Sequence, residues 1–172
     1  MSDGLTVRRA VVADAEAISG VNSRAWLHAY FDIVEPRRMF KRMEDVTQTQ
    51  QWATRLASPV GEIWCAEVGG VVAGYVAVGP SEDADGNPGT GALWSLDLDP
   101  SAQGAGLGSR LHDHALVLLE AAGFTRATLW VLVDNGLARR FYEGRGWIED
   151  PSGEGLQDPA WMGPAVRYRR EL

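Results

Sequence analysis

The chain has 172 residues, of which 45% are hydrophobic and 23% are charged, and its formal net charge at pH 7 is −7. This length suits one domain with a sizeable core and is short for two, so we expect a single domain spanning residues 1–172. The acidic charge argues against a general affinity for nucleic acid or for an anionic membrane surface, because both favour a basic face.

The N-terminal sequence and the single cysteine predict a soluble, cytoplasmic protein. The stretch MSDGLTVRR lacks the apolar segment of a signal peptide, and no apolar run approaches the roughly 18 residues of a membrane span. Cys65 has no partner for a disulfide and no metal-ligand spacing around it. We therefore interpret Cys65 as a buried, reduced thiol and predict no metal site.

The first third of the chain predicts one short strand followed by helices. Residues 4–9 alternate weakly between polar and apolar, as a strand does. Asp14 is a typical N-cap for a helix that we expect to run to about residue 34, with apolar side chains along its inner side. Pro36 begins a short helical piece to about residue 43, and residues 47–57 again carry apolar side chains at helical spacing.

The middle of the chain predicts a β-hairpin, a loop and a further strand. Residues 62–68 and 71–79 flank a Gly-Gly pair, which supplies the positive φ angles of a tight turn, so we expect these segments to pair antiparallel. Residues 81–91 are so polar and rich in glycine that we expect a mobile loop that does not pack. A strand is expected next, at residues 92–98.

The last third predicts a long helix at 106–122, a buried strand at 127–133, a short helix from about 135, and a final strand or strand pair. His112 and His114 lie on the polar flank of the long helix, so we interpret both as surface residues. A helix after each of two late strands implies a mixed sheet that helices cover on both faces.

A glycine-rich step joins the strand at 92–98 to the long helix. Its residues are Gln103, Gly104, Ala105, Gly106, Leu107, Gly108 and Ser109. Glycine lets the backbone N–H groups turn outward, and a helix that begins here adds its own unpaired N–H groups, so such a step can bind phosphate. A plain connecting turn and a dinucleotide-binding fingerprint are alternatives, although the latter expects G-x-G-x-x-G near the first strand.

Two motifs resemble those of one family. Gln103-x-x-Gly106-x-Gly108, between the strand end LDLDP and a long helix, resembles the acetyl-CoA-binding motif of the GNAT superfamily of N-acyltransferases. The stretch LWVLVDNGLARRFYEGRGW resembles the second signature of that family, with Trp147 where phenylalanine is usual. The resemblance covers nearly the whole chain. It implies an α/β (α+β) fold with a mixed, mostly antiparallel, twisted sheet of six to seven strands, about four helices on both faces, and a central V-shaped splay between strands 4 and 5.

The resemblance implies acetyl-CoA as the cofactor, with its pyrophosphate on the glycine loop and its pantetheine arm in the splay. Asn135 matches a residue that commonly bonds pantetheine, and a plain N-cap is an equal alternative. Tyr142 matches the general acid beside the sulfur, and a packed aromatic residue is its alternative. The implied cofactor-binding residues are Leu96, Leu98, Gln103, Gly104, Ala105, Gly106, Leu107, Gly108, Ser109, Asn135, Ala138, Phe141, Tyr142 and Arg145.

The implied reaction is direct attack by an amine on the thioester, with the oxyanion held by the backbone N–H of Leu98. The base is less evident, because Ala92 and Leu132 occupy positions where the family often has glutamate. Asp97 is the nearest carboxylate in sequence, and a bulge could turn it inward. A solvated or salt-bridged aspartate is the alternative interpretation, and His28 or a water-relayed path are other candidate bases.

We expect Trp26, His28, Tyr30 and Trp94 to border a pocket for a small-molecule or peptide amine, and the acidic surface favours a cationic one. An acetyl-CoA-dependent N-acetyltransferase is the leading hypothesis. A non-catalytic acyl-CoA sensor and a dinucleotide-dependent enzyme remain alternatives. A homodimer is compatible with the resemblance, and no nucleic-acid or membrane partner is expected.

Overall fold

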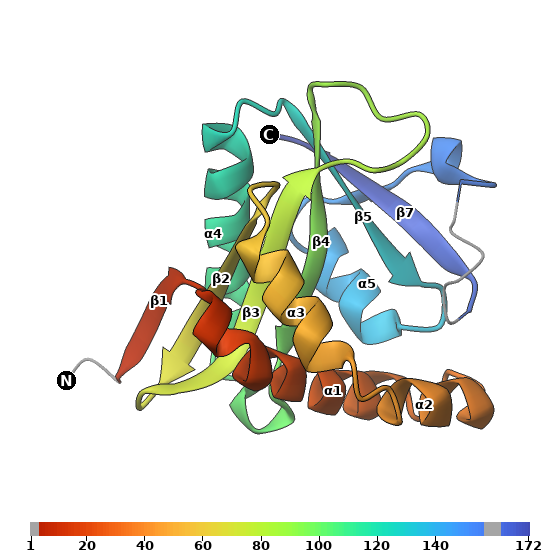
Figure 1. The fold of residues 1–172 in the computed structure, drawn as a ribbon. Helices are drawn as coiled ribbons and strands as arrows, with labels where there is room; N and C mark the ends of the chain where they lie inside the picture. Colours follow the sequence, from red (N-terminus) through yellow and green to blue (C-terminus); the bar gives the residue numbers. More distant parts are fainter. Residues whose placement is uncertain (1–3, 157–162) are drawn as a thin grey trace.

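The computed structural model describes residues 4–156 and 163–172, which form one mixed sheet with the strand order β1-β2-β3-β4-β5-β7-β6 (Figure 1). The strands are β1 (Leu5–Arg9), β2 (Glu62–Val68), β3 (Val71–Pro80), β4 (Thr90–Leu98), β5 (Arg126–Leu132), β6 (Ile148–Glu149) and β7 (Ala165–Glu171). The α-helices are α1 (Ala15–Tyr30), α2 (Pro36–Met43), α3 (Gln48–Ala57), α4 (Leu107–Ala121) and α5 (Gly136–Glu143). Every strand pair is antiparallel except β4–β5. The mixed, mostly antiparallel sheet is confirmed, with seven strands, and the described residues form five α-helices rather than four.

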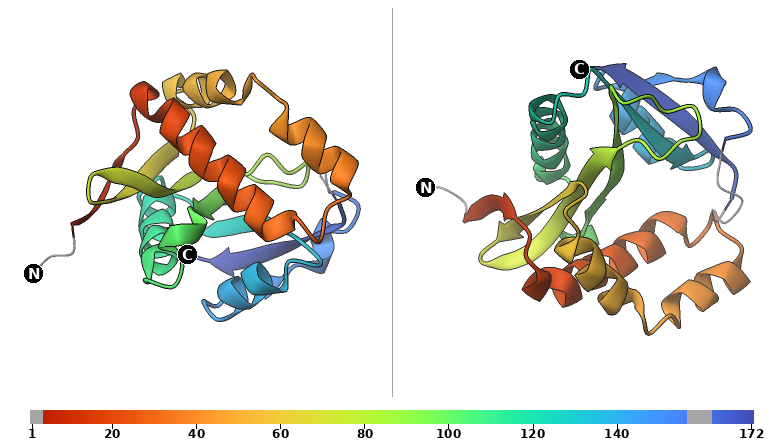
Figure 2. Two further views of the ribbon diagram at one scale, coloured as in Figure 1. Left: turned by 90° about the horizontal axis from the view of Figure 1, so that it is seen from below. Right: turned by 45° about the horizontal axis from the view of Figure 1, so that its top comes forward.

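Helices cover both faces of the sheet. On one face, Ile18 and Val21 of α1 and Trp52 of α3 pack against β2 and β3, where Cys65 and Tyr75 are fully buried. On the other face, α4 and α5 share the larger core with the sheet. Figure 2 shows α1–α3 on one side of the sheet and α4 on the other. Cys65 is a buried thiol, as predicted.

Two helices differ in detail from the sequence prediction. The first ends at Tyr30 rather than near residue 34. Asp14 is the N-cap residue, as predicted, but its carboxylate accepts hydrogen bonds from Val11 N–H and Arg8 and none from the first turn of the helix. In α4 the fully buried histidine is His112, so its prediction as a surface residue is wrong. The indole N–H of Trp147 donates to His112 Nε2 at 2.9 Å, so neither of these two buried nitrogen atoms lacks a hydrogen-bond partner. His114 is half-buried against the ring of Trp64.

The hairpin is confirmed, and the loop that follows it is not as predicted. Gly69 and Gly70 have φ angles of 58° and 80°, which joins β2 to β3 by a tight turn. The polar segment after β3 packs, because Asp83 and Asp85 both form ion pairs with the buried Arg167 of β7. The expectation that this segment does not pack is therefore wrong.

The sheet opens between its two parallel strands. Pairing of β4 with β5 comprises Thr90 with Arg126, Gly91 with Ala127 and Ala92 with Thr128. Beyond Ala92, β4 continues to Leu98 without pairing to β5. The V-shaped splay between strands 4 and 5 is thereby confirmed. None of the helices in the described part of the chain is long and apolar enough to cross a membrane.

Candidate active site

The edge of β4 that borders the splay carries unpaired backbone groups. The N–H of Asp99 donates to the carbonyl of Ala73 in β3 at 2.8 Å. Because backbone groups alternate in direction along a strand, Asp97 also directs its N–H and C=O toward β3, whereas Leu96 and Leu98 direct theirs into the splay. These two residues therefore offer hydrogen bonds to an extended ligand, as the sequence predicted for a pantetheine arm.

The glycine loop lies at the end of this edge, directly before α4. Gly104 and Gly106 have φ angles of 83° and 77°, and no atom lies within 4 Å of the position that a Cβ would take at either residue. Gly106 is the N-cap of α4 and supplies no side-chain acceptor for the first-turn N–H groups. Unpaired N–H groups beside open space and the positive end of a helix dipole suit an anion such as pyrophosphate.

The other residues predicted for the cofactor surround this loop. Gln103 and Ala105 are exposed within it, whereas Leu107 and Gly108 are buried at the start of α4. Ala138 and Phe141 of α5 pack against the same core. Arg145 stacks over the Phe141 ring at 3.8 Å and donates to the hydroxyl of Ser109, which ties the end of α5 to the first turn of α4. The structure therefore brings the predicted cofactor residues of α4 and α5 together.

Asn135 lies at the N-terminal end of α5, and Tyr142 lies near its C-terminal end. Asn135 Oδ1 accepts from the Ala138 N–H at 3.1 Å, which confirms the N-cap interpretation. Tyr142 is 8% exposed, and burial raises its pKa above the usual value, with further contributions from the charges of Asp97 and Tyr30. The Tyr142 phenol is therefore protonated at neutral pH, as a proton donor must be.

Asp97 belongs to a polar cluster on the α1 face of the sheet. Asn22 donates from Nδ2 to Asp97 Oδ2 at 3.0 Å and to the Tyr75 hydroxyl at 2.8 Å, and the Tyr75 hydroxyl in turn donates to Asp97. Burial raises the pKa of Asp97, and these hydrogen bonds and the nearby Arg42 oppose the rise. Asp97 is half-buried and bonds these two neutral side chains, and in the described ranges it forms no ion pair within 4.0 Å. A carboxyl group with a raised pKa is a better proton acceptor than an exposed one.

Aromatic side chains of α1 extend this cluster. Trp26 packs edge-on against Tyr30, with ring centroids 4.4 Å apart, and the guanidinium of Arg42 lies 4.1 Å above the Trp26 ring. Asn22, Trp26 and Tyr30 are spaced four residues apart and so share one face of α1. His28 is exposed and lies outside this face, so the structure does not bring it to the cluster.

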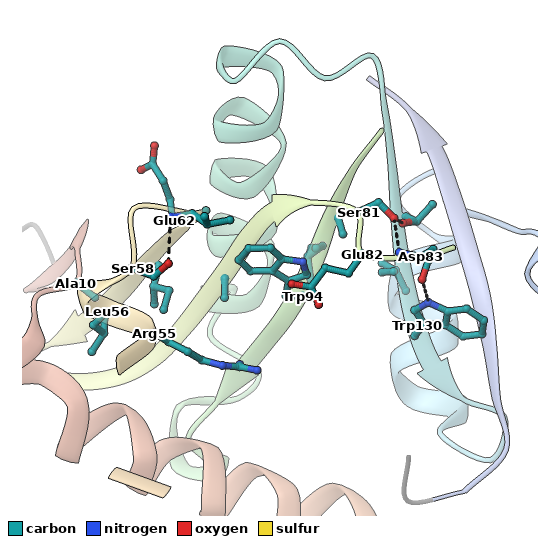
Figure 3. Close-up of a pocket in the computed structure, with 18 of the residues that line it drawn as sticks. Ala10, Arg55, Leu56, Ser58, Glu62, Ser81, Glu82, Asp83, Trp94 and Trp130 are labelled. Atoms are coloured by element: carbon teal, nitrogen blue, oxygen red, sulfur yellow. Dashed lines mark hydrogen bonds between the residues drawn. The ribbon is translucent and has the colours of Figure 1, made fainter. Parts of the chain in front are cut away.

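A cavity of about 670 Å³ opens on the same face of the sheet, between the C-terminal end of α3, the separating strands β4 and β5, and residues 81–84 (Figure 3). Ala92 and Trp94 line it from β4, and Thr128 and Trp130 line it from β5. Because Ala92 and Thr128 form the last pair before the strands separate, the cavity adjoins the beginning of the splay. Its volume lies within the roughly 300–1,000 Å³ of small-molecule sites.

Trp94 is held in this cavity by a bulge and by two glycines. The register between β3 and β4 shifts between Ala77 and Val78, which leaves Trp94 as the extra residue. A Cβ at Gly79 would lie 2.1 Å from the indole, and one at Gly61 would lie 2.3 Å from it. The ring therefore rests directly on glycine backbone, and its N–H donates to the Pro80 carbonyl at 3.2 Å.

Several residues of the site were not found from the sequence. Asn22, Arg42 and Tyr75 of the Asp97 cluster and Arg55, Glu82 and Trp130 of the cavity were not singled out. The spacing of Asn22 with Trp26 and Tyr30 was an available signal, because it predicts a shared helix face. The other contacts join residues that are distant in the chain.

Comparisons with known proteins agree with this geometry. Residues 24–147 match the model of the "Acetyltransferase (GNAT) family". Among curated proteins, the mycothiol acetyltransferase of Streptomyces avermitilis is 32% identical over 148 residues, covering 86% of this chain and 44% of that protein. The mycothiol acetyltransferase of Nocardioides sp. is 32% identical over 164 residues, covering 84% of this chain and 50% of that protein. The chain thus spans half or less of these relatives' length.

Solved structures share the fold over nearly the full chain. The PaiA N-acetyltransferase from Thermoplasma acidophilum, in complex with coenzyme A, superposes with a TM-score of 0.81 at 15% identity and covers 100% of both chains. The putative acetyltransferase yncA from Salmonella typhimurium, with acetyl-CoA, has a TM-score of 0.66 at 22% identity and covers 98% of this chain and 94% of that one. At these identities the likeness concerns the fold.

Proposed function

Because the chain belongs to the acetyltransferase (GNAT) family, we propose that it transfers the acetyl group of acetyl-CoA to a primary amine of a small molecule or peptide. The observation that carries this proposal is the unpaired edge of β4 at Leu96 and Leu98, which leads to the glycine loop at the start of α4. An extended chain with amides at one end and a pyrophosphate at the other fits both features. The acetyltransferases named above support the assignment.

Acetyl-CoA supplies the activated acetyl group as a thioester. The backbone N–H groups of residues 104–109 would hold the pyrophosphate, and Leu96 and the carbonyl of Leu98 would bond the pantetheine amides. Phe141 of α5 and Arg145, which follows that helix, would border the cofactor. In this arrangement the splay would hold the activated acetyl group, and the acceptor would enter from the α1 face.

The chain's own residues would support direct attack by the amine in a ternary complex. Asp97 would accept the ammonium proton, and the Leu98 N–H would stabilise the oxyanion. Tyr142 would give its proton to the departing sulfur. Positioning of the two reactants would supply the rest of the rate acceleration. No covalent enzyme intermediate is required.

We further propose that residues 1–172 form one catalytic domain that works in the cytoplasm. A single sheet shared by all the described strands supports the first part. The unpaired, buried Cys65 supports the second, because such a thiol persists in a reducing compartment.

Replacement of one glycine tests the cofactor site. A side chain at Gly106 would occupy the space in front of the α4 N-terminus, so Gly106→Ala should weaken coenzyme A binding at least about tenfold, as measured by calorimetry, because each lost charged hydrogen bond contributes about 1.5–3 kcal/mol. Gly123→Ala is the matched control, because Gly123 also has a positive φ angle and no neighbour within 4 Å but lies at the other end of α4.

The two variants should lose similar folding stability, since the strain of a left-handed backbone is about 1 kcal/mol at either position. Equal coenzyme A affinity in both variants would contradict the placement of the pyrophosphate. Binding of acetyl-CoA by the native protein without turnover of any amine would favour the non-catalytic sensor, for which the absence of glutamate at Ala92 and Leu132 is the supporting observation.

A further inference from the structure

The hydrogen bonds around Asp97 run in one direction and end on one of its oxygens. The Tyr75 hydroxyl and the Asn22 amide both donate to Asp97 Oδ2, the amide at 3.0 Å. The Tyr75 oxygen in turn accepts from Asn22 at 2.8 Å, so its own proton is left for the carboxylate. Because an ionised carboxylate only accepts hydrogen bonds, whereas a carboxylic acid must also place a proton, this arrangement fits the ionised form of Asp97.

The other carboxylate oxygen of Asp97, Oδ1, accepts no hydrogen bond from the described part of the chain. In that part, the buried side-chain atoms without a partner belong to Arg42, Ser95 and His114. Because Asp97 Oδ1 is not one of them, it retains exposed surface. The ammonium group of an acceptor can reach this oxygen, whereas the protein already occupies Oδ2.

Arg42 of α2 lies behind Asn22 in the same chain of hydrogen bonds. Arg42 Nη2 donates to Asn22 Oδ1, so the Asn22 amide nitrogen is the end that faces Asp97. Asn22 is 5% exposed, and without this donor its carbonyl would be buried without a partner. An amide turned the other way would present its oxygen to the carboxylate and repel it. Arg42 therefore decides which end of the amide Asp97 meets.

Arg42 also brings a positive charge to this cluster, in an unfavourable place for a guanidinium. The group stacks over the Trp26 ring at 4.1 Å, and its Nε is buried without a hydrogen-bond partner. Arg42 forms no ion pair with the residues that the structure describes. Burial of a charged group under these conditions costs free energy, so packing alone does not account for the position of Arg42.

We propose that Arg42 is a positioning residue for the base, which keeps the Asp97 carboxylate ionised by fixing the Asn22 amide toward it and by its own charge. This inference rests on the proposed acetyltransferase function, in which Asp97 accepts the ammonium proton. In that step an N–H bond of the ammonium breaks and the proton forms a bond to Asp97 Oδ1. The nitrogen keeps the electron pair with which it attacks the acetyl carbon. Arg42 itself touches neither reactant.

The ionisable groups that act on Asp97 come from four elements: Tyr75 of β3, Tyr30 of α1, Arg42 of α2 and Tyr142 of α5. Burial raises the pKa of all three phenols, so they stay neutral near pH 7. Burial also raises the Asp97 pKa, and the charge of Arg42 is one of the effects that oppose this rise. A changed titration of Asp97 after loss of Arg42 therefore reports the missing cation.

A titration of the Asp97 carboxyl in the full chain tests the inference without any acceptor. Carbon-13 NMR follows the aspartate carboxyl carbons, and the Asp97 resonance is identified by its loss in Asp97→Asn. Arg42→Gln should raise the Asp97 pKa by about 1, the lower end of the effect of a nearby opposite charge. Arg42→Lys keeps the charge and should restore the native midpoint. Asp99, which accepts from Arg24 and Ser101, is the internal reference and should titrate alike in every variant.

The pH dependence of coenzyme A release is the second readout, with acetyl-CoA and a primary amine that the native chain acetylates. Arg42→Gln should lower kcat/KM about tenfold below both midpoints and leave it unchanged above them, because a pKa higher by 1 reduces the ionised fraction tenfold. A merely structural role would lower kcat/KM equally at every pH. Arg37→Gln replaces an exposed arginine of the same helix and should change neither readout.

An unchanged Asp97 titration in Arg42→Gln overturns the inference, as does an equal shift in Arg42→Lys. A loss of kcat/KM that does not depend on pH also overturns it. If the native chain acetylates none of a panel of primary amines, the proposed function is wrong instead, whatever the carboxyl titration shows.

Discussion

Tyr142 and Asp97 come to the splay from different layers of the molecule. Tyr142 belongs to the core shared with α4, whereas Asp97 bonds Asn22 and Tyr75 on the α1 side. Burial raises the pKa of both groups. The same physical cause thus keeps a proton on the phenol and increases the proton affinity of the carboxylate, which are the properties that an acid and a base require.

Removal of one hydroxyl tests the role of Tyr142. Tyr142→Phe should lower kcat by about 10²-fold, the lower end of general acid–base contributions, and should leave the coenzyme A dissociation constant unchanged. Tyr168→Phe is the matched control, because Tyr168 is also buried but bonds Glu143 and Arg139 away from the splay. Equal kcat values for Tyr142→Phe and the native protein would show that the phenol does not act as the acid.

The buried His112 makes folding stability depend on pH. Burial lowers the His112 pKa below its usual value, with Asp113 opposing the shift. The folded state therefore binds this proton less readily than the unfolded state, so the free energy of unfolding should be constant above about pH 6.5 and should fall as the pH decreases from there. Urea titrations between pH 7.5 and 5.5 measure this slope.

His112→Gln should reduce the slope, since glutamine can accept the Trp147 hydrogen bond without titrating. A native slope that survives His112→Gln in full would assign the effect to other groups, such as the half-buried His114, whose pKa burial also lowers.

Single site residues were predicted where a local sequence motif carries them, and were missed where the partners are distant in the chain. Gly106, Asn135 and Tyr142 were identified because the motifs that carry them are local in sequence. The Asp97 cluster was not, because Asn22 and Asp97 are 75 residues apart and Tyr75 comes from another strand. The buried hydrogen bond between His112 and Trp147 was not predicted either, because the two residues are distant in the chain and His112 lies among polar residues of α4.

At the scale of elements, the segment after β3 shows how a polar sequence can pack. Arg167 of β7 is 4% exposed and forms ion pairs with Asp83, Asp85 and Asp150. Asp83 also accepts from the Trp130 indole at 2.9 Å. These contacts fix the segment that carries Glu82 over the cavity. The sequence did not predict them, because the guanidinium lies 84 residues beyond Asp83.

Loss of this guanidinium should destabilise the fold. Arg167→Gln leaves Asp83 and Asp85 without their cation and leaves Asp150 only Arg169 at 3.9 Å. Breaking a buried ion pair costs about 3–5 kcal/mol of unfolding free energy. Arg126→Gln is the control, because its exposed pair with Glu171 should contribute less than about 1 kcal/mol. Urea unfolding of both variants measures the difference, and equal losses would contradict a structural role for the cluster.

Regular elements were predicted more reliably than their ends or registers. Apolar spacing identified the helices and the Gly-Gly turn identified the hairpin, since both signals are local. In α4, Leu119 is fully buried whereas its neighbour Leu118 is only partly buried, because the packing of the helix on the sheet decides between adjacent apolar positions. The bulge at Trp94 also depends on pairing with β3 and has no signal of its own.

At the scale of the whole molecule, the sheet consists of two parts joined by three residue pairs. Strands β1–β4 form one part and β5, β7 and β6 the other, and the pairs between Thr90–Ala92 and Arg126–Thr128 connect them. A cofactor that bonds Leu96 and Leu98 would lie between the parts as an added strand. Binding should therefore protect backbone groups that the protein alone leaves unpaired.

Amide hydrogen exchange tests this arrangement. Addition of coenzyme A should slow exchange at Leu96, because its N–H gains an acceptor, and should change Asp99 little, because its N–H already donates to Ala73. Uniform slowing along β4 would indicate general stabilisation rather than direct bonding. Unchanged exchange at Leu96 with bound coenzyme A would contradict the strand-like placement.

The indole of Trp94 packs directly on Gly61 and Gly79, so the shape of the cavity depends on these two positions having no side chain. A single added methyl group at Gly79 would collide with the indole and force it to tilt. Such a change would alter the shape of the cavity while leaving the glycine loop and the edge of β4 untouched. A substitution at Gly79 can therefore change what the cavity accommodates without altering the region proposed for the acetyl donor.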